Sequence, residues 1–456
     1  ITVNETTKPT ALANVDAKCS ATLTAPTLDD PCAGILTATT TTASPITTLG
    51  TTVVRWTFDY GNGYTQFVDQ NVNISSCLPA FDCSDGLGYV IANSNAGGSQ
   101  ANYISGLLSF DLAAGGRTTL IDNQLIDQSA NRFINAIGYN VIDNYIYGIR
   151  QFTNEVVRIG SDGKVDILPT NGLDPSIRYE SGDVSSSGVL FAYNTGSNRM
   201  YSINLNPSAS DYLTPTTIIP TGGGFAFDDF TFSPIDGMAY GVIRGSHRLF
   251  RFNPTTNRFT NIGLINGVSA TDGAVYGTAF MDHLGNLYFA NNSSGNVYKV
   301  LTPHLATGEV TATMFTHLDV TPGDGARCPN TPVKPIAVVD SGCVAQGGTA
   351  NFVVSANDTG GSFPINSLST MLIDPITSAR TTSVNIASQG TFSINNTTGA
   401  INFVSVAGFT GTTISYVIAD TQGNYSFPAL LTVEICPAPS IQITKDGLYV
   451  DTNGDG

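Results

Sequence analysis

The chain has 456 residues, which predicts roughly three domains at about 150 residues each. Only 12% of the residues are charged, the net charge is −16, and no cluster of Lys or Arg occurs, which excludes nucleic acid as a partner. No apolar run reaches the ~18 residues of a spanning helix, so direct membrane insertion is excluded too. Seven cysteines without metal-ligand spacing are typical of disulfides, which predicts an extracellular protein.

Apolar and polar residues alternate with a period of two along most of the chain, and helical periodicity is almost absent. Residues 52–58, 391–394 and 414–418 are examples, and Gly, Asn, Asp and Pro separate such runs. The predicted fold class is therefore all-β. Residues 1–75 are expected to form a small sandwich with Trp56 in its core.

The middle of the chain contains internal repeats. Residues 139–148 return as residues 232–241, an offset of 93, and weaker copies lie at 184–193 and 280–290. Each copy is followed by short apolar strands, at about 40 to 50 residues per unit, which is typical of propeller blades. Residues 84–328 thus predict a five-bladed β-propeller, with six blades as the alternative.

The first repeat lacks an opening strand, because residues 88–92 already have the pattern of a second strand. Residues 324–328 have the pattern of a first strand with no blade after it, so we expect them to complete blade one and close the ring. Closure would place Cys83 beside Cys328, and a disulfide between them would fasten the ring. The alternative, in which Cys83 pairs with nearby Cys77, stays open.

Residues 331–436 predict a second sandwich with Cys343 and Cys436 at its ends. A bond between them would tie the first strand to the last. A Pro-rich step and the start of another strand follow, so we expect further domains of the same longer chain. The predicted domains are 1–75, 76–330, 331–437 and a truncated 438–456.

Four segments resemble known modules. Residues 19–34 with 56–63 resemble bacterial HYR-like immunoglobulin-fold modules, and residues 135–140 with 324–328 resemble an uncharacterised propeller-like family of secreted surface proteins. Residues 406–411 and 416–423 resemble the fibril repeats of CshA-type adhesins and cadherin-like modules. Residues 443–456 resemble the start of stalk domains in giant Bacteroidota surface proteins.

These resemblances imply two immunoglobulin-like sandwiches flanking the propeller, in a cell-surface adhesin of the gliding-motility kind exported by the type nine secretion route. The HYR-like resemblance also implies a Cys19–Cys32 bond. With Cys83–Cys328 and Cys343–Cys436, that bond leaves Cys77 over.

First strands line the channel of a propeller, and their polar residues are the candidate ligand-binding set: Asn135, Asp183, Asp228, Asp229 and Asp324. Such oxygen-bearing side chains suit a cation. The alternative is that they are hydrated and hydrogen-bonded to neighbouring strands. With only five Glu in the chain, and four His at no catalytic spacing, we expect no enzyme and assign no catalytic residue.

Calcium is the one cofactor that the sequence suggests. Asp451, Asn453 and Asp455 match the first half of a calcium-binding loop, whose remaining ligands lie beyond the chain. Acidic turns at Asp340, Asn357, Asp358 and Asp420 fit either calcium or side chains that cap their own backbone, and we favour capping.

We thus expect a non-catalytic segment of a secreted adhesin or filament, with the propeller as the head that binds a surface glycan or protein. A purely structural spacer and, less favoured, a metal-dependent propeller hydrolase are the alternatives.

Overall fold

The structure is a computed structural model that describes residues 7–437 and 452, apart from 62, 76, 96–102, 115–117, 123–132, 154, 274 and 320–322. The chain divides into two compact units, Ile1–Pro332 and Val333–Gly456. Strands hold 50% of the residues, which confirms the all-β prediction. Helical structure among the described residues is confined to four short turns: η1 (Cys83–Asp85), η3 (Leu112–Ala114), η4 (Pro303–Leu305) and η5 (Val354–Ala356).

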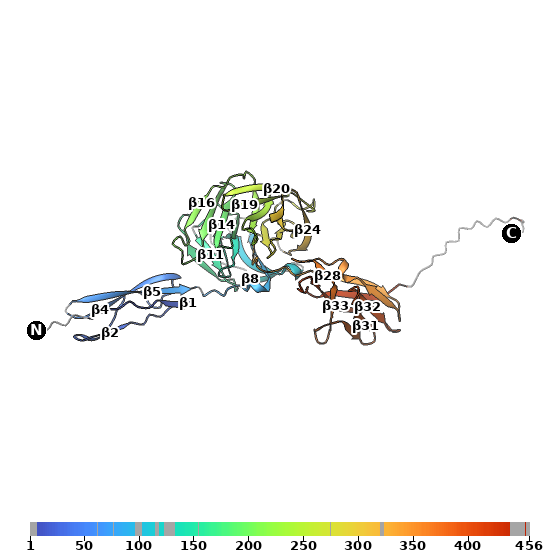
Figure 1. Cartoon of the computed structure of the whole chain (residues 1–456), viewed down its shortest axis with the longest axis horizontal. Helices are drawn as coiled ribbons and strands as arrows, with labels where there is room; N and C mark the ends of the chain where they lie inside the picture. Colours follow the sequence, from blue (N-terminus) through green and yellow to red (C-terminus); the bar gives the residue numbers. More distant parts are fainter. Residues whose placement is uncertain are drawn as a thin grey trace. The chain divides into compact units, whose positions relative to one another are not determined.

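Residues 7–77 form a small β-structure, here called the first module (Figure 1). Its sheet has the order β1-β5-β4, and a separate hairpin joins β2 to β3. The strands are β1 (Val15–Lys18), β2 (Thr27–Asp30), β3 (Gly34–Thr37), β4 (Gly50–Asp59) and β5 (Thr65–Ser75). Alternate residues of β4 point into the core, where Trp56 is buried and donates from its indole N–H to the Gln70 side-chain oxygen, 2.9 Å away.

The part of the chain between Cys83 and Cys328, here called the ring, is built from antiparallel groups of four strands, the last two of which join through β20 and β24 into one eight-stranded sheet. In order from the inner strand outward, the sheets are β25 (Asp324–Arg327), β6 (Gly88–Asn95), β7 (Tyr103–Phe110), β8 (Thr118–Asp122); β9 (Ile134–Asn140), β10 (Tyr145–Arg150), β11 (Glu155–Ile159), β12 (Val165–Pro169); β13 (Ser181–Val184), β14 (Val189–Asn194), β15 (Arg199–Asn204), β16 (Pro215–Ile218); β17 (Phe227–Phe232), β18 (Ala239–Ile243), β19 (Arg248–Asn253), β20 (Arg258–Asn266); and β21 (Thr278–Met281), β22 (Leu287–Ala290), β23 (Asn296–Val300), β24 (Val310–His317).

The inner strands of these sheets form a closed circuit. Strand β25 lies against β9, β9 against β13, β13 against β17, β17 against β21, and β21 against β25 again. The arrangement is propeller-like, and the outer strands β20 and β24 also pair in parallel between Ile265 and Val310. Aromatic and aliphatic side chains fill the space between neighbouring sheets. Tyr193, for example, stacks on Phe227 with ring centroids 4.7 Å apart.

The sequence repeat corresponds to a repeated contact. After an inner strand, an Asp in the turn accepts a hydrogen bond from a Tyr hydroxyl in the second strand. The Asp143–Tyr147 and Asp236–Tyr240 bonds, one from each copy, both measure 2.6 Å. Because both members of each pair sit at the same repeat positions, the turn and the second strand take the same relation in the two sheets.

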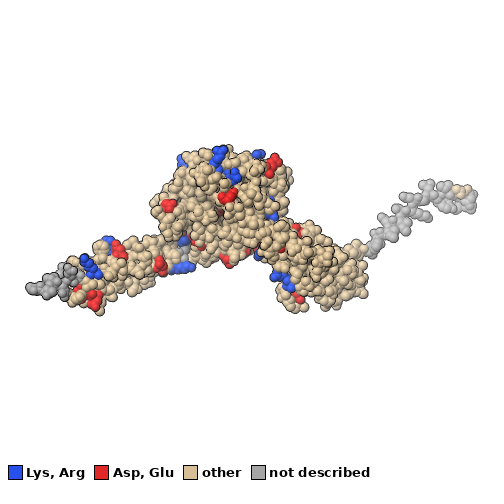
Figure 2. Space-filling model, in the orientation of Figure 1, with Lys and Arg blue, Asp and Glu red and all other residues tan. Residues whose placement is uncertain are grey.

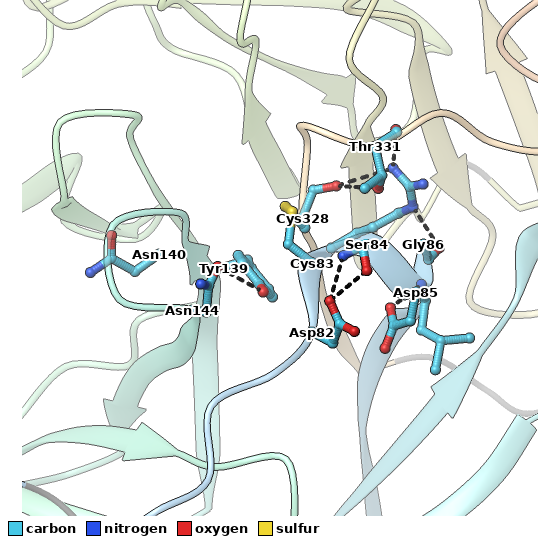
Figure 3. The surroundings of a disulfide bond; sticks show 12 residues. Asp82, Cys83, Ser84, Asp85, Gly86, Tyr139, Asn140, Asn144, Cys328 and Thr331 are labelled. Carbon is cyan, nitrogen blue, oxygen red and sulfur yellow. Dashed lines mark hydrogen bonds between the residues drawn. A yellow bond between two sulfur atoms is a disulfide. The ribbon is translucent and has the colours of Figure 1, made fainter.

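The ring closes with strands from its two ends. Strand β25 pairs antiparallel with β6, from Asp324 opposite Ile91 to Arg327 opposite Gly88, as the sequence predicted. A disulfide joins Cys83 to Cys328, with Cα atoms 5.4 Å apart. Figure 3 shows this bond beside Gly86 and Thr331. The chain's last ring strand thus completes its first sheet.

The buried guanidinium of Arg327 reinforces the closure. It donates to main-chain carbonyl oxygens at 2.9 to 3.2 Å on both sides of the junction: those of Gly86, Met281, Cys328, Thr331 and Pro332. A buried cation is costly unless its donors are satisfied, and these carbonyls satisfy them.

The expected Cys19–Cys32 bond is wrong. Cys19 bonds to Cys77, and Cys32 is free and exposed. The reason is the parallel pairing of β1 with β5, which sets Lys18 opposite Ser75 and brings the next cysteines together at the same end of the sheet. Cys32 lies instead in the β2–β3 turn, where its N–H donates to Asp30. Cys77 is therefore not left over.

The C-terminal unit is a two-sheet sandwich whose sheets have the orders β26-β34-β33-β28-β29 and β27-β32-β31-β30. Phe392, Phe403 and Phe409 pack between them, and a Cys343–Cys436 disulfide joins the first strand to the residue after the last. The strands are β26 (Asp340–Val344), β27 (Thr349–Phe352), β28 (Ile365–Ile373), β29 (Arg380–Thr381), β30 (Ser383–Ile386), β31 (Gly390–Ile394), β32 (Ile401–Ser405), β33 (Thr412–Asp420) and β34 (Ala429–Ile435).

Candidate functional site

The five polar residues predicted to line the channel all lie on inner strands of the ring. Asn135 is on β9, Asp183 on β13, Asp228 and Asp229 on β17, and Asp324 on β25. Asp229 and Asp324 are almost completely buried, Asn135 is buried and Asp183 is partly buried. For Asn135, Asp183, Asp228 and Asp229 this placement follows from the repeat, since each precedes the turn into a second strand, whereas Asp324 lies on the strand that completes the first sheet from the other end of the ring.

Three of the carboxylates tie one sheet to the next. Each accepts the N–H of the residue that follows it and also an N–H from the neighbouring inner strand. Asp324 receives the Ile137 N–H at 2.9 Å, Asp183 receives the Phe232 N–H at 2.7 Å, and Asp229 receives the Ala279 N–H at 2.8 Å. These acids replace the main-chain hydrogen bonds that strands in different sheets cannot make with one another.

Burial dominates the electrostatics of these acids. It raises the pKa of Asp183 to about 7. Burial, with the nearby Asp324 charge, raises the pKa of Asp229 well above its usual range, and burial raises that of Asp324 likewise. Hydrogen bonds from main-chain amides favour the ionised forms and partly oppose these shifts. The ring interior therefore holds acids that bind protons more tightly than surface Asp.

The remaining two predicted residues behave differently. Asp228 forms an ion pair with Arg244. The buried side-chain oxygen of Asn135 has no hydrogen-bond partner among the described residues, and neither do the buried hydroxyls of Ser181 and Thr278 on β13 and β21. Polar atoms of this kind are usually satisfied by water or a bound molecule. Ligand binding by the five residues stays a prediction.

The acidic clusters of the chain do not build a metal centre in the part that the structure describes, where no group of three or more His, Cys, Asp or Glu could hold an ion. Asp420 caps its own turn, accepting the N–H groups of Gln422 and Asn424. The calcium candidates Asp451, Asn453 and Asp455 lie outside the described residues.

Asp340 and Asp358 converge on the Tyr416 hydroxyl of β33, at 2.8 and 3.3 Å. Asn357 also donates to Asp340, at 3.2 Å. Burial, helped by the neighbouring Asp340 charge, raises the pKa of Asp358 to about 6. The pair is thus held by a Tyr, and one of its members takes up a proton in mildly acidic solution.

A hollow of about 340 Å³, here called the rim pocket, lies where the turn after β9 and the turns around β14 and β15 meet Lys18 and Ser75 at the ends of β1 and β5. The ring residues that line the rim pocket include Asn140, Ile142, Asp143, Tyr145, Arg158 and Ser187. The Arg158 guanidinium lies 5.1 Å from the Tyr145 ring centroid and donates to Asp166 at 2.8 Å. Its Nε has no partner among the described residues.

Sequence reasoning missed the rim pocket. Asp143 lies inside the quoted repeat, but Arg158 comes from the third strand of the sheet and Ser187 from the next sheet. Only the repeated Asp143–Tyr147 pair could have drawn attention to this turn. A second hollow, of about 630 Å³, lies along β23 and β24 and is lined by residues such as Leu301, Leu305 and Thr311.

Charged side chains are sparse and of both signs on the face of the molecule in Figure 2, with no extended basic patch. Among the described residues, no helix has the length and apolar character needed to cross a membrane.

Fold and site together define an all-β protein with a propeller-like ring, closed by a disulfide and followed by a β-sandwich. Residues 96–330, more than half of the chain, match a family described as a repeat of unknown function (DUF6923), and the chain belongs to that family. Residues 331–434 match a bacterial Ig domain, which identifies the sandwich as immunoglobulin-like. No curated protein matches the chain.

Solved structures with some similarity include virginiamycin B lyase from Staphylococcus aureus, with 9% identity, 70% of this chain and 99% of that chain covered, and a TM-score of 0.33. A gluconolactonase from Xanthomonas campestris has 11% identity, coverages of 77% and 96%, and a TM-score of 0.32. A protein of unknown function from Bacteroides thetaiotaomicron has 9% identity, coverages of 73% and 95%, and a TM-score of 0.35. Likenesses this slight carry no argument about activity.

Proposed function

We propose that the chain is a non-catalytic segment of a secreted bacterial surface protein, in which the ring is a five-bladed propeller that binds a surface glycan or protein. The bacterial Ig domain supports a surface or structural protein, and three disulfides suit an extracellular location. The more specific assignment, a Bacteroidota adhesin with an HYR-like first module, rests on the sequence resemblances.

The rim pocket carries the binding proposal. Its volume lies within the range of small-molecule sites, about 300 to 1,000 Å³. Asp143 supplies an acceptor, Arg158 a donor, and Ile142, which is 62% exposed, an apolar surface. Lys18 of the first module also lines the pocket, so its wall carries charges of both signs together with hydroxyl and amide groups. Such a wall offers both donors and acceptors to a ligand with many hydroxyl groups, and a sugar residue is the proposed ligand.

The pocket can be blocked without disturbing the core. Ser187 is exposed, so Ser187→Trp should fill the pocket and leave the sheets intact, whereas Thr256→Trp, at an exposed turn elsewhere on the ring, is the matched control. We expect the full chain to bind members of a glycan array, Ser187→Trp to weaken that binding at least tenfold, and Thr256→Trp to leave it unchanged. Absence of binding at millimolar sugar would overturn the glycan assignment.

The acids of the inner strands support the absence of catalysis. Because both oxygens of Asp183, Asp229 and Asp324 already accept main-chain N–H groups, these acids are committed to joining sheets. A hydrolase that used them would need a bound ion in the channel. Metal analysis of the purified protein tests this alternative, and a stoichiometric ion would revive it.

One observation favours a second function, that of a spacer in a surface filament: in each of the three modules a disulfide joins a cysteine at or beside the first strand to one just after the last. An in-frame deletion of residues 83–328, which removes Cys83 together with Cys328, separates the two functions. Cells that carry the deletion should lose adhesion if the ring is a binding head. Adhesion at the wild-type level would instead favour the spacer.

A further inference from the structure

The three disulfides share a position relative to the chain. Each joins a cysteine beside or within the first strand in the sequence of the first module (Cys19 follows β1), of the ring (Cys83 precedes β6) or of the C-terminal unit (Cys343 lies in β26) to a cysteine just after the last strand. The bonded cysteines are 58 residues apart in the first module, 245 in the ring and 93 in the C-terminal unit.

The ring shows the arrangement most clearly. Cys83 lies just before β6, the first strand of the ring in the sequence, and Cys328 directly follows β25, the last. Their Cα atoms are 5.4 Å apart although 245 residues separate them. The chain therefore enters and leaves the ring at one covalently closed junction (Figure 3).

The two flanking modules repeat the arrangement with a different topology. In each, the first strand pairs in parallel with the last, β1 with β5 and β26 with β34. Parallel partners end at the same edge of a sheet, so cysteines placed near their ends meet. The Cα–Cα distances are 4.7 Å for Cys19–Cys77 and 4.8 Å for Cys343–Cys436.

We propose that the three disulfides form a continuous tension path, so that a pull between the two ends of the chain passes through the bonds and leaves the three disulfide-closed loops folded, with β1 and the first residues of β26 outside the loops. Force follows covalent bonds, and a loop whose two ends are bonded together carries none of it. The proposal depends on the surface role proposed above, because only a chain anchored at one end and attached at the other is pulled.

Between the bonds the path runs through residues 77–83 and 328–343, and non-covalent contacts hold parts of both segments. Within the first segment, the Phe81 N–H donates to the Asn144 carbonyl oxygen at 2.8 Å. Arg327 holds the carbonyl oxygens of Thr331 and Pro332, just after the ring closes, and that of Gly86, just after it begins. Arg327 thus supports the junction that the disulfide closes.

Each disulfide keeps a long loop of chain from being extended, and the three loops differ in length. Since a residue spans at most about 3.3 to 3.6 Å, full extension of the bypassed residues would release roughly 800 to 880 Å for the ring, roughly 310 to 335 Å for the C-terminal unit and roughly 190 to 210 Å for the first module. The bonded Cα atoms are about 5 Å apart in the fold, so nearly all of this length would be gained. Cleavage of each disulfide should therefore be recognisable from the length by which the chain extends when that loop unfolds.

Single-molecule force spectroscopy on the full chain, held by tags at both ends, tests the tension path. The oxidised chain should stretch without any step of the ring's length. Addition of dithiothreitol to the same folded, tethered molecules should produce steps of all three lengths. The pair Cys83→Ser and Cys328→Ser should show the ring's step alone without reductant, and Cys32→Ser, which removes the free thiol, should behave as wild type.

A step of the ring's length in the oxidised wild-type chain would overturn the proposal, and so would the absence of new steps after reduction. Reduction of already folded molecules keeps the test valid if the double Ser variant fails to fold. Ligand binding without force is measured separately on the glycan array. Failure of the surface role would therefore appear as lost binding or adhesion, and failure of the tension path as early unfolding steps.

Discussion

The first module and the C-terminal unit use the same closure around cores of very different size. Both place the first strand parallel to the last and join the two by a disulfide. The C-terminal unit packs two sheets around Phe392, Phe403 and Phe409, with ring centroids 4.3 and 5.3 Å apart. The first module has one three-stranded sheet and a hairpin around Trp56.

This difference teaches where the covalent bond matters most. A small domain buries a smaller fraction of its surface, so its hydrophobic core alone leaves little net stability. The disulfide should therefore decide whether the first module folds, whereas in the C-terminal unit it should add to a core that is already sufficient. The following predictions test this contrast, from the largest expected effect to the smallest.

The pair Cys19→Ser and Cys77→Ser should unfold the first module at 37 °C. Loop-closure entropy for a loop of 58 residues is worth about 4 kcal/mol, close to the whole stability of a small domain. Trp56 is the single tryptophan of the chain, so its fluorescence reports on this module alone. We expect a red-shifted emission, as the indole leaves the core.

The matched control is the pair Cys343→Ser and Cys436→Ser. Removal of this disulfide, which closes a loop of 93 residues, should cost a similar free energy of unfolding. The C-terminal unit should nevertheless stay folded and only lose thermal stability. Calorimetry measures that loss. The contrast between the two modules would be contradicted by an unchanged Trp56 emission in the variant with Cys19→Ser and Cys77→Ser. It would also be contradicted by an unfolded C-terminal unit in the variant with Cys343→Ser and Cys436→Ser.

Phe403→Ala should destabilise the C-terminal unit by about 3 kcal/mol, because a completely buried ring leaves a cavity between the two sheets. Hydrogen exchange of peptides from this unit measures the change. Val404→Ala is the control, since Val404 is 49% exposed and its removal should cost less than about 0.5 kcal/mol. Equal effects would show that the sandwich core is not the main source of stability there.

Acid should act in opposite directions on the contributions of two carboxyl groups, Asp30 of the first module and Asp358 of the C-terminal unit. Hydrogen bonds from the N–H groups of Thr7 and Ala33 lower the pKa of Asp30, so its contribution to the first module is present near neutral pH and lost as the pH falls through the lowered value. Asp358 has its pKa raised to about 6, so its contribution to the C-terminal unit is fully present below the unfolded value of 3.8 and lost as the pH rises through 6.

Melting curves between pH 3 and pH 8 measure these trends, with Trp56 fluorescence for the first module and hydrogen exchange for the C-terminal unit. Asp358→Asn should flatten the change in the C-terminal unit between pH 4 and pH 6 and leave the Trp56 profile unchanged. The same pH profile in wild type and variant would rule out Asp358 as the group that titrates.

Gln70→Ala should have the smallest effect, about 1 kcal/mol on the first module, because it removes the partner of the Trp56 indole N–H. Chemical denaturation followed by Trp56 fluorescence gives the value. Asn71→Ala, at the adjacent exposed position of β5, is the control and should change little. If Gln70→Ala lowers the free energy of unfolding much more than Asn71→Ala does but leaves the Trp56 emission maximum unchanged, Gln70 has a role other than holding the indole.

Sequence patterns predict those features of the fold that depend on the order of the strands along the chain. Strand alternation gave the fold class, and the incomplete first repeat predicted that residues 324–327 pair with β6. The same reasoning joined Cys343 to Cys436 at the ends of one sandwich. Applied to the first module it would have joined Cys19 to Cys77, but the resemblance to HYR-like modules led to the wrong pair.

The candidate site was harder to predict, because its contacts cross between sheets. The pattern of a first strand with no blade after it places Asp324 on an inner strand, but nothing in the sequence says that the Ile137 N–H, 187 residues away, will bond to it. The rim pocket likewise needs Asp143, Arg158 and Ser187 from three separate strands or turns. Local patterns find elements, whereas packing between sheets decides which side chains meet.

Completion of the first sheet by β25 also governs how the ring can form. Until residues 324–327 have been made and released, β6 has an unpaired edge and the circuit of inner strands has a gap. The defining contacts of the ring are therefore among its most distant in sequence, which predicts slow folding and a late, cooperative final step. A chain cut short anywhere before Asp324 should expose that edge and aggregate.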